Sequence, residues 1–140
     1  MIAFLKKHSY ILLFLWIGFV LAISFMEAPL KFTSDKVDLS IGVSIGRIVF
    51  KALNSVEIVL LVLYTVFTIM NKTFKNNYKL YVLISILLIQ TFILLPYLDE
   101  RALAIIQNVE VPESRMHMYY VILEISKVAI LFWLGIQQIQ

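Results

Sequence analysis

Residues 41–70 read IGVSIGRIVFKALNSVEIVLLVLYTVFTIM, a run that is long and apolar enough to cross a membrane. A spanning helix needs roughly 20 apolar residues at a rise of about 1.5 Å each. Three further stretches meet this requirement, so the expected spans are residues 10–27, 41–70, 79–98 and 115–137. The sequence therefore predicts an all-α integral membrane protein, in which residues 1–140 form a single domain, a four-transmembrane-helix bundle of up-down-up-down topology.

The composition supports a membrane protein and excludes other classes. Of the 140 residues, 61% are hydrophobic and 15% are charged, whereas soluble domains have about 45–50% apolar and about 25% charged residues. The chain has no cysteine, which excludes disulfides and thiolate ligands, and its two histidines are too few to form a zinc site by themselves. The net charge of +3, without a basic patch interleaved with aromatic residues, predicts no nucleic-acid partner and leaves the lipid bilayer as the expected environment.

The distribution of basic residues favours one orientation in the bilayer. One side of the bundle is expected to carry a cluster without neighbouring acids, namely Lys6, Lys7, Lys72, Lys75 and Lys79, whereas the other side mixes basic with acidic residues. Positive charge in short loops marks the cytoplasmic side. We therefore expect both termini to be cytoplasmic, in a multi-pass protein of the cell membrane, of the bacterial inner-membrane type.

Two of the expected spans carry polar and ionisable residues along one face. At about 100° per residue, the second span brings together Arg47, Lys51, Asn54 and Glu57. The fourth span does the same with His117, Tyr120, Glu124 and Lys127. Charged side chains inside a membrane usually face the bundle interior and pair with one another. The two stripes therefore predict one shared polar interior, in which these residues are candidate ligand-binding groups.

The depth of each residue predicts how the two stripes meet. Counted from the cytoplasmic ends of their helices, Glu57 lies roughly 20 Å deep and Lys127 roughly 14 Å deep, inside a hydrocarbon core of about 30 Å. We therefore predict a Glu57–Lys127 ion pair, which serves either a functional role or only helix packing. Glu124 is expected one turn further out, near Lys51, and Gln90 of the third span is expected to join the network.

The outer mouth of this polar interior is expected to hold Glu27, Tyr97 and Tyr120. Arg47 and His117 are expected near the same outer boundary, close to Glu27. The alternative for Arg47 is that its side chain extends to the outer headgroups and takes no part in a site. Tyr97 is included because it lies seven residues after Gln90 of the third span, and therefore on the same face of a regular α-helix.

Two further patterns predict packing. Gly42 and Gly46 have the spacing of small residues at which helices approach closely. The aromatic residues, Trp16 and Trp133 among them, are expected mostly to face lipid or to form an interfacial belt.

Short motifs carry a family resemblance. The segment Ala28-Pro29-Leu30-Lys31-Phe32 resembles an Ala-Pro-x-x-Phe signature after a first span, and residues 42–50 resemble the glycine-containing start of a second span. His117, followed seven residues later by Glu124, is similar to a histidine followed by asparagine, with glutamate here in place of that asparagine. In these motifs the chain resembles the transmembrane protein 205-like family (domain of unknown function 4149), which implies a four-helix fold more than a function.

Three functions remain open at this point. The first, which we favour, is the binding or conduction of a small polar ligand, an ion or protons at a buried site that opens to the extracytoplasmic side. The second is a membrane enzyme, or a haem- or quinone-linked redox protein with His117 as the axial ligand. The third is a structural or accessory subunit of a membrane complex. The sequence contains no phosphate-binding loop, nucleophile elbow or metal-ligand helix motif, so it fixes neither a reaction nor a cofactor. A transporting form is expected to be a homo-oligomer, because the chain is short.

Overall fold

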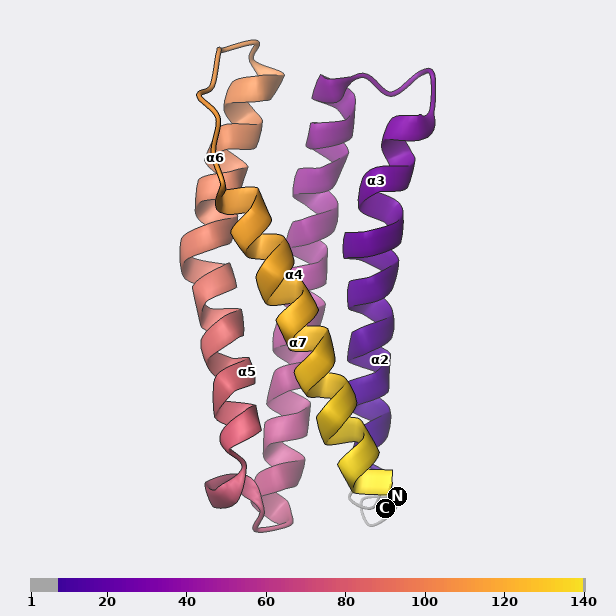
Figure 1. The fold of residues 1–140 in the computed structure, drawn as a ribbon, viewed down its shortest axis with the longest axis vertical. Coiled ribbons are helices and arrows are strands. Elements are labelled where there is room, and N and C mark those ends of the chain that lie inside the picture. Colours follow the sequence, from indigo (N-terminus) through magenta and orange to yellow (C-terminus); the bar gives the residue numbers. More distant parts are fainter. Residues whose placement is uncertain (1–7, 140) are drawn as a thin grey trace.

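The computed structural model describes residues 8–139, which form helices joined by loops and contain no strand. Four helical segments are long and apolar enough to cross a membrane: Tyr10–Thr33, Leu39–Met70, Tyr78–Ile106 and Met116–Ile139. They lie side by side in a bundle (Figure 1). The prediction of an all-α chain with four long apolar helices is confirmed, although each segment except the second is longer at its carboxyl end than predicted.

The first segment is a continuous but irregular helix. It consists of α2 (Tyr10–Val20), the π-helical turns η1 (Leu21–Glu27), the short α3 (Ala28–Leu30) and the 3-10 turn η2 (Lys31–Thr33). Pro29 is the second residue of α3 and lies two positions after the end of η1, where the α-helical hydrogen-bond pattern is already interrupted. The helix consequently passes the proline and ends six residues beyond the predicted boundary at residue 27.

The second segment is the single helix α4 (Leu39–Met70). It begins where the side chain of Asp38 accepts a hydrogen bond from the backbone N–H of Ile41 at 2.8 Å, an N-cap that satisfies one of the free amides of the first turn. Its 32 residues give a length of about 48 Å at about 1.5 Å per residue. This helix is therefore longer than the hydrocarbon core of a bilayer, which is about 30 Å thick.

The third segment also contains a π-helical turn. It runs through α5 (Tyr78–Ile89), η4 (Gln90–Leu94) and α6 (Leu95–Ile106), after the 3-10 turn η3 (Phe74–Asn76) that connects it to α4. The predicted span ended at residue 98, because acidic residues follow, but the helix continues to Ile106. It ends just before Asn108, which has a positive φ of 56°, a conformation that asparagine tolerates at helix ends.

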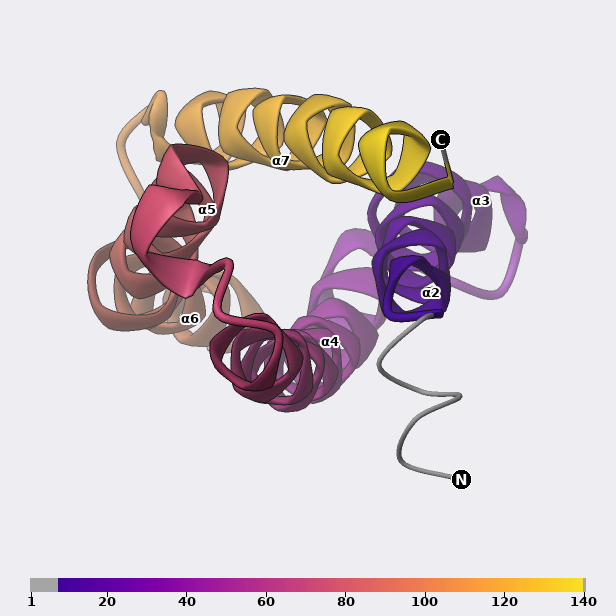
Figure 2. The same ribbon diagram turned by 90° about the horizontal axis from the view of Figure 1, so that it is seen from below.

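The fourth segment, α7 (Met116–Ile139), crosses the bundle obliquely. It begins beside α6 and ends beside α2 (Figure 1). The hydroxyl of Ser9 donates to the side-chain oxygen of Gln138 at 2.8 Å, so the start of the first segment and the end of the last lie next to each other. Seen from below, α2, α4, α5 and α7 surround a common interior (Figure 2).

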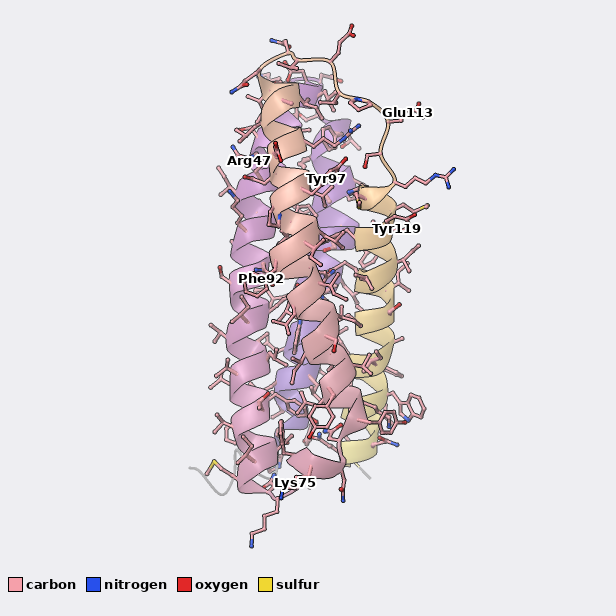
Figure 3. All side chains as sticks on the ribbon, turned by 90° about the vertical axis from the view of Figure 1, so that its left-hand side faces the viewer. Arg47, Lys75, Phe92, Tyr97, Glu113 and Tyr119 are labelled. Atoms are coloured by element: carbon pink, nitrogen blue, oxygen red, sulfur yellow. The ribbon has the colours of Figure 1, made fainter. Side chains whose placement is uncertain are left out.

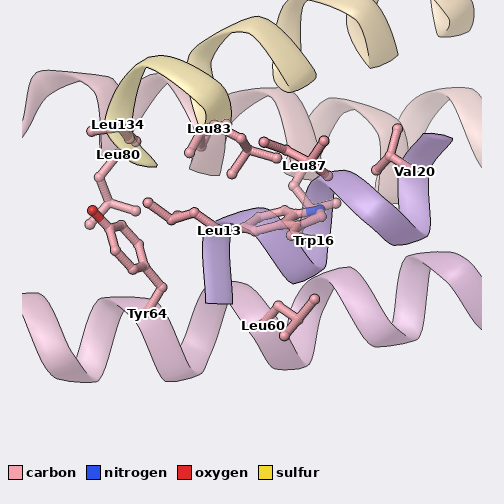
Figure 4. Close-up of a cluster of buried hydrophobic side chains, with 11 residues drawn as sticks. Leu13, Trp16, Val20, Leu60, Tyr64, Leu80, Leu83, Leu87 and Leu134 are labelled. Carbon is pink, nitrogen blue, oxygen red and sulfur yellow. The ribbon is translucent and has the colours of Figure 1, made fainter. Parts of the chain in front are cut away.

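The apolar core occupies the part of the interior nearest to the Ser9–Gln138 contact. In Figure 4 the side chains of all four segments meet there, with Trp16 and Tyr64 among the largest that are fully buried. The buried members of this cluster are Leu13, Trp16, Ile17, Val20, Leu60, Tyr64, Leu80, Leu83, Leu87, Leu131 and Leu134. Going along the four helices away from this core, one meets first a layer of buried polar side chains and then a cavity.

Large apolar side chains also cover the outside of the bundle. Phe92 on η4, for example, is 71% exposed and points away from the bundle (Figure 3). Exposed large apolar side chains occur on every long segment. Soluble monomers rarely present so much contiguous apolar surface, and a bilayer would solvate it.

Candidate functional site

Lys127 on α7 lies at the centre of the buried polar layer. Its ammonium group pairs with the carboxylate of Glu57 from α4 and, at 2.6 Å, with that of Glu124 on its own helix. The three side chains are at most 1% exposed. The predicted Glu57–Lys127 pair is therefore confirmed.

Gln90 links this ion pair to the third segment. Its side-chain oxygen accepts from the Lys127 ammonium at 2.7 Å, and its amide nitrogen donates to Glu124 at 2.7 Å. The prediction that Gln90 joins the network is confirmed. Gln90 is the first residue of the π-helical turn η4, and such turns often mark functional positions in helices.

The first segment contributes two partners that were not predicted. The indole N–H of Trp16 donates to Glu57 at 2.7 Å, and the hydroxyl of Ser24, on the π-helical η1, donates to Glu124 at 2.9 Å. The expectation that Trp16 faces lipid is wrong, because its side chain is fully buried. A tryptophan in the middle of a span, away from the interface where its N–H would meet water, is the signal that could have identified this donor.

These six residues, Trp16, Ser24, Glu57, Gln90, Glu124 and Lys127, form what we call the polar cluster. Within residues 8–139, every fully buried side-chain nitrogen or oxygen has a hydrogen-bond partner. The cluster nevertheless contains two carboxyl groups for one ammonium group. Full ionisation would leave one uncompensated negative charge in a medium of low dielectric constant, which is costly. The cluster can therefore hold a proton at one carboxyl group.

A second ion-pair group lies further from the core. The guanidinium of Arg47 binds Asp99 of α6 in a two-bond arrangement, with Nε–Oδ1 at 2.7 Å and Nη2–Oδ2 at 3.1 Å. The ammonium of Lys51 lies 3.0 Å from the same Asp99 Oδ1. Lys51 was expected near Glu124. The two residues line one cavity, but Lys51 pairs with Asp99 and Glu124 pairs with Lys127. The sequence suggested that Asp99 begins a loop, whereas α6 continues through it to Ile106.

The other predicted site residues of α4 and of the first segment have separate partners. Asn54 accepts a hydrogen bond from the hydroxyl of Thr91 at 2.9 Å, between α4 and η4. Glu27 pairs with Lys31 at 3.2 Å, one turn along its own helix. Glu27 and Arg47 thus belong to two separate ion pairs, because Arg47 pairs with Asp99.

A cavity of about 650 Å³ lies between the first segment, α4, α6 and α7. Five of the predicted residues line it together: Arg47, Lys51, His117, Tyr120 and Glu124. Glu124 thus belongs both to the cavity wall and to the polar cluster, which closes the cavity on the side of the apolar core. Tyr120 is buried, with its ring edge-on to that of Phe50 at a centroid distance of 5.6 Å.

Tyr97, which was expected at the outer mouth of the polar interior, does not line the cavity. It is 41% exposed, whereas Gln90, seven residues earlier, is buried. The two residues would share a face of a regular α-helix, but η4 lies between them, and its wider turn changes the angular register. Tyr97 therefore does not share the buried face of Gln90, and it is not among the residues that line the cavity.

The glycines of α4 form part of the cavity wall. A Cβ atom on Gly42 would lie 2.1 Å from the ring of Phe32, and one on Gly46 would lie 3.1 Å from the ammonium of Lys31. The two glycines therefore leave room for the side chains of Phe32 and Lys31 from η2. Another helix was expected to pack closely against them. The Lys31 ammonium also lies 5.9 Å from the ring centroid of Phe50. Residues 8–139 contain no group of three or more histidine, aspartate or glutamate side chains that could hold a metal ion.

No protein-family model, no curated protein and no solved structure matches this chain. The resemblance to the transmembrane protein 205-like family therefore stays a prediction.

Proposed function

We propose that this chain is a multi-pass protein of a cell membrane that binds a small ligand in the cavity between the first segment, α4, α6 and α7. In this proposal the four helices cross the bilayer alternately, both termini lie in the cytoplasm, and the cavity opens toward the extracytoplasmic side. The lysines of the α4–α5 connection, Lys72 and Lys75, support this orientation because positive loops stay on the cytoplasmic side.

One observation carries the proposal. Five of the polar and charged residues on the inward faces of two helices line a single cavity, among them Arg47, His117 and Glu124. The cavity volume of about 650 Å³ is typical of small-molecule sites, which enclose about 300–1,000 Å³ and combine apolar walls with a few polar groups. The polar cluster closes the inner end, so a ligand that enters remains in the outer half of the bundle.

A pair of neighbouring substitutions on α7 tests ligand binding. Val121 lines the cavity, whereas the next residue, Ile122, is exposed on the outside of the bundle. Val121→Trp should therefore fill the cavity, and Ile122→Trp adds the same side chain to the lipid-facing surface. Native mass spectra of the proteins purified in mild detergent should show a retained small molecule in the wild type and in Ile122→Trp, but not in Val121→Trp. Equal retention in all three proteins would contradict the proposal.

The polar cluster favours a second candidate function, the exchange of a proton. Its two carboxyl groups, Glu57 and Glu124, share the single ammonium of Lys127, so one carboxyl group is expected to be protonated. The infrared spectrum of the wild type should therefore contain a band from a protonated carboxyl group, and this band should be missing from Glu57→Gln/Glu124→Gln. The surface variant Glu113→Gln is the control. A wild-type spectrum without such a band would refute proton storage at the cluster.

A further inference from the structure

The charge and the apolar walls of the cavity indicate a class of ligand, an inference that rests on the proposed ligand-binding function. We infer that the cavity accommodates an anionic amphiphile, a molecule with a phosphate or carboxylate head and a hydrocarbon tail. The head is placed beside the ion-pair group of Arg47, Lys51 and Asp99, and the tail lies along the apolar wall.

The ion-pair group has more positive than negative charge. Asp99 is the carboxylate that Arg47 and Lys51 share, so these three side chains together carry one excess positive charge. The Lys51 side chain is 57% exposed and is therefore free to turn its ammonium group toward an incoming anion. Arginine and lysine together bind phosphate and carboxylate groups through charge-assisted hydrogen bonds.

The remaining charged groups of the cavity wall do not cancel this excess. Lys31 is neutralised by Glu27. Glu124 belongs to the polar cluster, which is neutral as a whole when one of its two carboxyl groups holds the proton proposed above. Arg101, which also lines the cavity, uses its guanidinium to bind the backbone carbonyl of Pro112, a neutral partner. An anionic head consequently meets a wall whose balance of charge is positive.

The rest of the wall suits a hydrocarbon chain. Aromatic and aliphatic side chains from several segments line the cavity, among them Phe25, Phe32, Phe50, Leu95, Leu98 and Val121. Burial of a tail against these side chains removes apolar surface from contact with water. A free inorganic anion would leave this surface unused, and an uncharged lipid would leave the excess positive charge without a partner.

The depth of the ion-pair group matches the level of lipid headgroups. A hydrocarbon core of about 30 Å corresponds to roughly 20 residues of helix. Counted back from Met70, where α4 ends at a polar turn, this length reaches the region of Phe50 and Lys51. Arg47 and Lys51 therefore lie at the outer boundary of the hydrocarbon, where the head of a membrane amphiphile resides.

Competition between two lipids tests this ligand class. The detergent-purified protein is mixed with equal amounts of phosphatidylglycerol and phosphatidylcholine that carry the same acyl chains, and the bound lipid is counted by native mass spectrometry. One lysine at a membrane surface changes the affinity for an anionic lipid by about fivefold. The wild type should therefore prefer phosphatidylglycerol by about that factor, and Lys51→Gln should lose the preference.

Lys75→Gln is the matched control, because Lys75 is an exposed lysine at the opposite end of the bundle from Arg47 (Figure 3). It should keep the preference of the wild type. Equal binding of the two lipids by the wild type, or the same preference in Lys51→Gln, would overturn the inference. Displacement of the lipid by inorganic phosphate alone would also overturn it, since the head would then suffice without a tail. If Val121→Trp still removes a bound molecule while lipid charge has no effect, only the ligand class is wrong and the cavity proposal stands.

Discussion

The ammonium group of Lys127 pairs with two carboxylates in the interior of the bundle, so its removal should lower the free energy of unfolding. Lys127→Met keeps a long apolar side chain but leaves Glu57 and Glu124 without their cation. Breaking a buried ion pair by removing one partner costs about 3–5 kcal/mol. We expect the free energy of unfolding in detergent to fall by about this amount, measured by chemical denaturation.

Two companion variants separate charge from side-chain volume. The triple variant Glu57→Gln/Glu124→Gln/Lys127→Met carries none of the three charges and should recover much of the lost stability, because no buried charge remains unpaired. Lys36→Met, at an exposed position of the α3–α4 connection, should change stability by less than about 0.5 kcal/mol. If the single and triple variants at Lys127 were equally unstable, the loss would come from packing and not from charge.

Trp16 is expected to stabilise the same cluster through its indole N–H. Trp16→Phe keeps an aromatic ring in the core but removes the donor that binds Glu57. The loss of one partner of a buried hydrogen bond costs about 1–3 kcal/mol. Trp133→Phe is the control, because Trp133 is 55% exposed and its replacement should cost less. Equal unfolding free energies for the two variants would show that the Trp16 hydrogen bond contributes nothing.

At the scale of the elements, the contact between α4 and η2 depends on the absence of a side chain at Gly42. Gly42→Ala would place a Cβ atom 2.1 Å from the ring of Phe32, so the η2 turn has to move, at a cost of about 1–3 kcal/mol. Gly18→Ala is the matched control, since nothing lies within 4 Å of the Cβ position there. It should leave stability unchanged or raise it, because alanine favours helices over glycine by about 1 kcal/mol.

The double variant Gly42→Ala/Phe32→Ala checks the cause of that loss. It removes the ring that the new Cβ atom would contact. Gly42→Ala should therefore lower the thermal unfolding midpoint less when it is made in a Phe32→Ala protein than when it is made in the wild type. Additive effects of the two substitutions would mean that they act independently, contrary to the contact in the structure.

The elements also show why part of the structure followed from the sequence and part did not. The helices could be predicted because a bilayer demands long apolar stretches, and the Glu57–Lys127 pair could be predicted because depth along two helices is simple arithmetic. The position of Asp99 could not, because acidic residues after an apolar run resemble a loop. Tyr97 was misplaced because no pattern in the sequence announces the π-helical turn η4, which changes the register of the residues after it.

The cavity was the least predictable feature of all. It depends on Phe32 and Lys31 lying over the two glycines of α4, and on the oblique path of α7 (Figure 1). Both are consequences of how the helices pack in three dimensions. Periodicity indicates which face of a helix is buried, but it does not indicate how completely neighbouring side chains fill the space against it.

For the whole molecule, the proposed orientation can be tested because the chain has no cysteine of its own. Lys75 and Glu113 lie at opposite ends of the bundle (Figure 3). We expect a membrane-impermeant maleimide to label Glu113→Cys in intact cells, and to label Lys75→Cys only after the membrane is permeabilised. The reverse pattern would invert the orientation, and labelling of both variants from outside would contradict an alternating path across the bilayer.

The hydrogen bond between Ser9 and Gln138 brings the beginning of α2 next to the end of α7. The turn between α4 and α5 lies at the same end, since Asn71 and Asn77 surround one surface pocket together with these two residues. A short linker could therefore join α7 to α2, while a cut in the α4–α5 turn would supply new termini at the same end of the bundle. Circular permutation would thus leave the number and direction of the long helices unchanged, and the order in which α2 and α7 are synthesised would become a variable for studies of membrane insertion.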